Sequence, residues 1–92
     1  MSLPSKKTFF EHIRLLYGTE YCTDKGYDFL LRIINNKEDE EYMSYLQELI
    51  GMSIKQKYEY RNILAENGTE LTPKQLDQKL FIIQYALNHI YS

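Results

Sequence analysis

The sequence predicts an all-α fold: a compact antiparallel bundle of four to five helices that forms a single domain over residues 1–92. In several segments, apolar residues recur at the three- and four-residue spacing of amphipathic helices. No segment of five or more residues shows the apolar-polar alternation of a half-buried strand. The two prolines, Pro4 and Pro73, lie outside the periodic segments, so neither interrupts a predicted helix.

The first predicted helix spans residues 5–17. Phe9, Ile13 and Leu16 recur at helical spacing and are expected on its buried face. Gly18 follows directly. Because glycine most readily adopts the left-handed conformation that ends many helices, it predicts the end of this helix.

The second predicted helix spans residues 24–34. Thr23 is a suitable N-cap, and the negative charge of Asp24 is favourable at the positive end of the helix dipole. The spacing of four apolar residues predicts a buried face that consists of Tyr27, Leu30, Leu31 and Ile34. Phe29 and Ile33 widen this face.

The segment 38–66 predicts a third helix that breaks near residues 51–53. Four acids, Glu38 to Glu41, open it and suit the first turn of a helix. Consecutive carboxylates point in different directions around a helix, so they do not predict a metal site. An unbroken helix over this segment would be roughly 43 Å long, which is more than a compact domain of this size accommodates. Gly51 lowers helix stability in an interior position and is where we expect the break. One straight helix over residues 38–66 is the alternative, and it would suit an elongated dimer.

The last predicted helix begins at Pro73. Thr72 at the N-cap, Pro73 at the first helical position and Gln75 two residues later form a capping-box pattern. After this start, alternating spacings of four and three predict an apolar seam that consists of Leu76, Leu80, Ile83, Leu87 and Ile90.

This C-terminal helix carries more apolar residues than one buried stripe requires. Phe81, Ile82 and Tyr85 lie outside the seam. Burial of a side chain of this size contributes about 1.5–3 kcal/mol, so we do not expect all three to face water. Two explanations remain open: the helix is central in the bundle, or one of its faces contacts another molecule. The residues predicted for such an interface are Phe81, Ile82, Tyr85 and Tyr91.

The functional hypothesis is a non-enzymatic interaction or regulatory module. It acts through protein–protein contacts and self-associates through the C-terminal helix, so its expected partner is another protein or a second copy. The surplus of apolar residues in 80–91 motivates this hypothesis.

A DNA-binding regulator is the alternative, with a helix-turn-helix-like segment over residues 55–80. Its candidate basic residues are Lys55, Lys57, Arg61 and Lys74. Residues 67–72 form too long a connection for this motif, and the following helix soon becomes apolar. The net charge of −2 also disfavours nucleic acid as a partner.

The sequence predicts neither catalysis nor a cofactor. His12, His89 and Cys22 are the residues closest to catalytic chemistry, but no nucleophile motif, phosphate-binding loop or zinc-ligand spacing surrounds them. We expect no metal and no membrane, because the longest uncharged stretch has 13 residues and a bilayer needs about 20. One cysteine permits no intrachain disulfide, and the start of the sequence does not resemble a signal peptide. The expected location is the cytoplasm.

In size, in its lack of paired cysteines and in its four-helix pattern, the chain is similar to small bacterial bacteriocin-immunity proteins. None of their diagnostic motifs is present, so the similarity concerns architecture and assigns a role to no residue. An immunity-like function is a further alternative on this basis.

Overall fold

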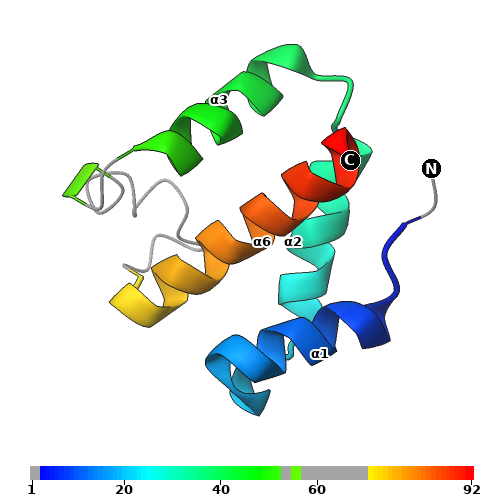
Figure 1. Cartoon of the computed structure of the whole chain (residues 1–92), viewed down its shortest axis with the longest axis vertical. Coiled ribbons are helices and arrows are strands. Elements are labelled where there is room, and N and C mark those ends of the chain that lie inside the picture. The colour runs from blue at the N-terminus through cyan, green and yellow to red at the C-terminus, as the bar shows by residue number, and fades with distance from the viewer. Residues whose placement is uncertain (1–2, 53–54, 57–70) are drawn as a thin grey trace.

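The computed structural model describes residues 3–52, 55–56 and 71–92. Both ends of four α-helices and of one short 3₁₀ helix lie among these residues: α1 (Lys6–Tyr17), η1 (Thr19–Tyr21), α2 (Asp24–Asn35), α3 (Glu40–Gly51) and α6 (Pro73–Tyr91) (Figure 1). None of the described residues lies in a strand. The predicted all-α fold is therefore confirmed, and a radius of gyration of 12.8 Å matches the value of about 12 Å expected for a compact chain of this length.

The capping box at the start of α6 is confirmed. The Thr72 hydroxyl accepts a hydrogen bond of 3.2 Å from the Gln75 amide, and the Gln75 side-chain oxygen accepts one of 2.9 Å from the Thr72 amide. Both bonds satisfy amide groups that have no partner inside the helix. Side-chain caps also begin the other three helices, from Ser5 to the Thr8 amide, Thr23 to the Gly26 amide and Asp39 to the Tyr42 amide.

Two predicted helix ends are also present. Helix α1 ends at Gly18, which has a positive φ of 105° and donates its amide to the Arg14 carbonyl oxygen. Its ψ of 165° is not that of a left-handed helix, so glycine is required here for a more extended turn. Helix α3 ends at Gly51, and Met52 is extended, which confirms the predicted break on the N-terminal side. The rest of the predicted third helix falls largely outside the described residues.

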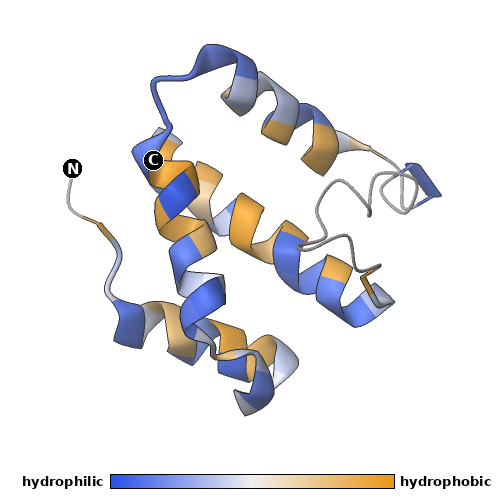
Figure 2. Cartoon of the chain, turned by 180° about the vertical axis from the view of Figure 1, so that it is seen from behind, coloured by the Kyte–Doolittle hydropathy of each residue, from blue (hydrophilic) through white to orange (hydrophobic). Residues whose placement is uncertain are grey.

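Helix α6 lies at the centre of the molecule. It contacts α1, α2 and α3, and its contact with α2 is the most extensive. Helices α1 and α3 lie on opposite sides of α6 and run in the opposite direction, whereas α2 crosses it (Figure 1). Apolar residues recur along α6 through the middle of the fold (Figure 2). The arrangement is an antiparallel bundle around a central helix, with one crossing member.

The core explains why α6 is apolar on several sides. Ile82, Ile83 and Ala86 are all at most 1% exposed. They pack with residues from α1, α2 and α3: Phe9, Ile13, Phe29, Leu30, Ile33, Ile34, Met43, Leu46 and Leu49. Because three helices surround α6, an apolar residue is buried on nearly every side of it. The central-helix explanation therefore accounts for most of the apolar surplus.

Ile82 and Leu16 lie in environments that differ from the expected ones. Ile82 was predicted at an intermolecular interface, but it is 1% exposed and leaves no side-chain surface for a partner. Leu16 was predicted on the buried face of α1, but it is 61% exposed. In both cases the neighbouring helices, and not the spacing within one helix, decide which side is covered.

Candidate protein-binding surface

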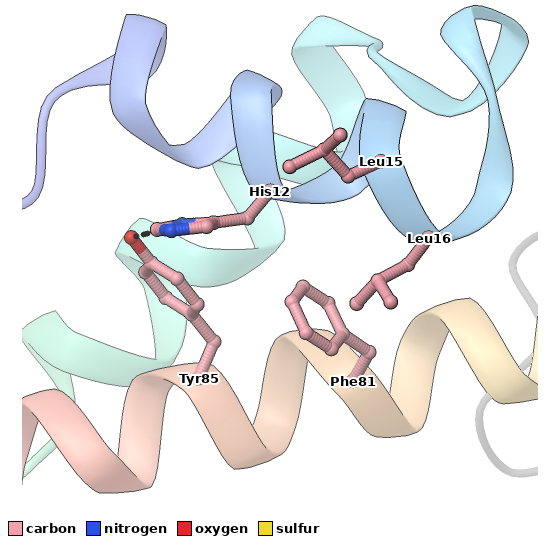
Figure 3. Close-up of a pocket in the computed structure, with 5 residues that line it drawn as sticks. All are labelled: His12, Leu15, Leu16, Phe81 and Tyr85. Atoms are coloured by element: carbon pink, nitrogen blue, oxygen red, sulfur yellow. Dashed lines mark hydrogen bonds between the residues drawn. The ribbon is translucent and has the colours of Figure 1, made fainter.

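An apolar hollow of about 370 Å³ opens between α1 and α6 (Figure 3). We call it the α1/α6 groove. Its lining consists of His12, Leu15 and Leu16 from α1 and Phe81 and Tyr85 from α6. Hollows of this size that are lined by leucine and aromatic side chains are typical of sites that bind apolar ligands or side chains.

Helix α1 contributes its exposed leucines to the groove. Leu15 is 82% exposed and Leu16 is 61% exposed, whereas Phe9 and Ile13 on the same helix are at most 1% exposed. Two residues along a helix correspond to about 200° of rotation, so Leu15 points away from the core that buries Ile13. The same core contacts that fix α1 therefore direct Leu15 outward.

Helix α6 contributes two aromatic rings one helical turn apart. The Phe81 and Tyr85 ring centroids are 5.9 Å apart. The Tyr85 ring also meets Phe9 of the core edge-on at 5.3 Å, and Phe81 meets Tyr17 of α1 at 5.8 Å. Such tilted contacts are favourable for aromatic pairs, so the groove floor is held by the core beneath it.

One polar contact lies at one end of the groove. His12 Nδ1 and the Tyr85 hydroxyl share a hydrogen bond of 3.3 Å. In Figure 3 these two side chains point toward each other, while Leu16 and Phe81 approach each other at the other end. Burial raises the pKa of the Tyr85 hydroxyl, so it stays protonated beyond its usual range. The lining contains no carboxylate, thiol, guanidinium or ammonium group, and this composition suits binding better than proton transfer or nucleophilic attack.

The structure places the predicted interface residues in three different environments. Phe81 and Tyr85 are half-buried and line the groove. Ile82 is in the core, and Tyr91 is 58% exposed in the last turn of α6, outside the groove lining. Sequence reasoning missed all three groove residues of α1. The sequence feature that could have located them is the pair Leu15-Leu16. Phe9 and Ile13 already define the side of α1 that faces the core, so adjacent leucines cannot both lie on that side.

The residues of the DNA-binding alternative are not shown to form one surface. Lys74 Nζ lies 3.6 Å from the Glu20 carboxylate and 5.2 Å from the centre of the Tyr21 ring, so η1 engages it. Lys55 is exposed. Lys57 and Arg61 lie outside the described residues.

Other candidate chemistry is sparse among the residues that the structure describes. No cluster of three or more His, Cys, Asp or Glu residues there is arranged to hold a metal ion. Cys22 is half-buried, and its thiol donates a hydrogen bond of 3.4 Å to the Phe10 carbonyl oxygen. Among the described helices, none combines the length and the hydropathy needed to span a bilayer.

Comparison of the chain with protein-family models, with curated proteins and with solved structures finds no significant match.

Proposed function

We propose that this chain is a non-enzymatic protein-interaction module that binds apolar side chains of a partner in the α1/α6 groove. The observation that carries the proposal is Leu15, a leucine that is 82% exposed at the edge of an apolar hollow. Burying a leucine contributes about 1.5–3 kcal/mol, and the free chain forgoes most of that contribution at this position.

The composition of the groove supports a protein partner. Aromatic residues are enriched in the cores of protein interfaces, and charged residues are depleted there. Phe81 and Tyr85 supply the aromatic surface, and the lining has no Asp, Glu, Lys or Arg. The His12–Tyr85 hydrogen bond provides one polar group at the margin, where an interface commonly contacts water.

The non-enzymatic part of the proposal rests on the same composition. Catalysis requires polar groups that converge on a reacting atom, and the groove offers one such pair among apolar neighbours. We place this binding function in the cytoplasm, where the free thiol of Cys22 would stay reduced.

A capture experiment with matched variants tests the proposal. The whole chain, the variant Leu15→Glu and the variant Ser44→Glu would each be used as bait in a lysate of the organism that encodes the chain. Leu15 and Ser44 are both exposed, and they lie on α1 and α3, on opposite sides of α6. A partner of the groove is captured by the unaltered chain and by Ser44→Glu, and is lost with Leu15→Glu. Equal capture by all three baits would contradict the proposal.

A further inference from the structure

We draw no further inference here: the strongest candidate, the apolar α1/α6 groove with the His12–Tyr85 hydrogen bond at one end, belongs to the binding surface already described, and nothing in the structure shows what covers it.

Discussion

Helices α6 and α1 contrast in how their apolar residues are used. In α6 the apolar residues exceed one stripe, and the structure buries most of them because α1, α2 and α3 surround the helix. In α1 the apolar residues resemble one ordinary stripe, yet Leu15 and Leu16 are 82% and 61% exposed. The helix that looks too apolar for the surface is the interior one, and the helix that looks ordinary carries the exposed leucines.

The contrast shows that surplus apolar surface is a property of the assembled fold. A helix with neighbours on three sides can bury residues all round, and a helix with a neighbour on one side cannot. The amount of apolar sequence in a helix therefore does not locate an interface. Leu15 is informative because Phe9 and Ile13 already define the side of α1 that faces the core.

The largest expected effect comes from shortening a side chain of α6. Ile83 is 0% exposed, and Ile83→Ala should lower the free energy of unfolding by about 2–5 kcal/mol through lost burial and the cavity left behind. Urea denaturation followed by circular dichroism measures the loss. An effect as small as that of Leu15→Ala would break the comparison between the two helices.

A smaller effect is expected at the start of α6. Thr72→Ala removes the hydroxyl that accepts the Gln75 amide and should cost about 1 kcal/mol of unfolding free energy. Thr72→Ser retains an accepting hydroxyl and should keep most of that stability. Thermal unfolding of both variants decides whether the cap, and not the methyl group of threonine, holds the first turn of the central helix.

Alkaline pH should reduce stability through tyrosines on both helices. Burial raises the pKa of Tyr85, and burial together with the negative charge of Asp77 raises the pKa of Tyr17. An acid whose pKa is raised on folding binds its proton more tightly in the folded state. Its contribution is therefore complete below the unfolded pKa of about 10 and is lost as pH rises past that value toward the folded pKa. The unfolding free energy measured between pH 9 and 11 should fall less steeply in Tyr85→Phe, and an unchanged slope would contradict this cause.

The smallest expected effect on folding is at Leu15. Leu15→Ala should change the unfolding free energy of the dilute chain by less than about 0.5 kcal/mol, because the side chain is already largely in water. The same substitution should reduce the amount of partner captured through the groove. A large loss of stability would mean that α1 depends on Leu15 for its own packing, and the two helices would then not differ in this respect.

Local features of the fold were predictable because short-range chemistry determines them. The hydroxyls of Thr23 and Thr72 cap the helices that follow, and α3 ends at Gly51 where the break was expected. These signals depend on hydrogen bonds and backbone preferences within a few residues. These local features therefore do not depend on how the rest of the chain packs.

The candidate site was predictable only in part because it joins residues distant in the sequence. Phe81 and Tyr85 were expected at an interface, but the opposite wall of the groove comes from α1, and His12 and Tyr85 are 73 residues apart. Spacing within α1 suggested that Leu16 would be buried with Ile13. Which side of α1 is covered depends on where α6 lies. The spacing of apolar residues within α1 contains no information about the position of α6.

The central position of α6 also constrains the order in which the molecule can form. Translation produces α1, α2 and α3 before the helix that contacts all three. Until α6 is made, their inner faces have no common partner, and a growing chain would hold apolar surface in water that chaperones recognise. The final collapse must then join segments about 70 residues apart, which slows folding relative to a bundle whose neighbours in space are neighbours in sequence.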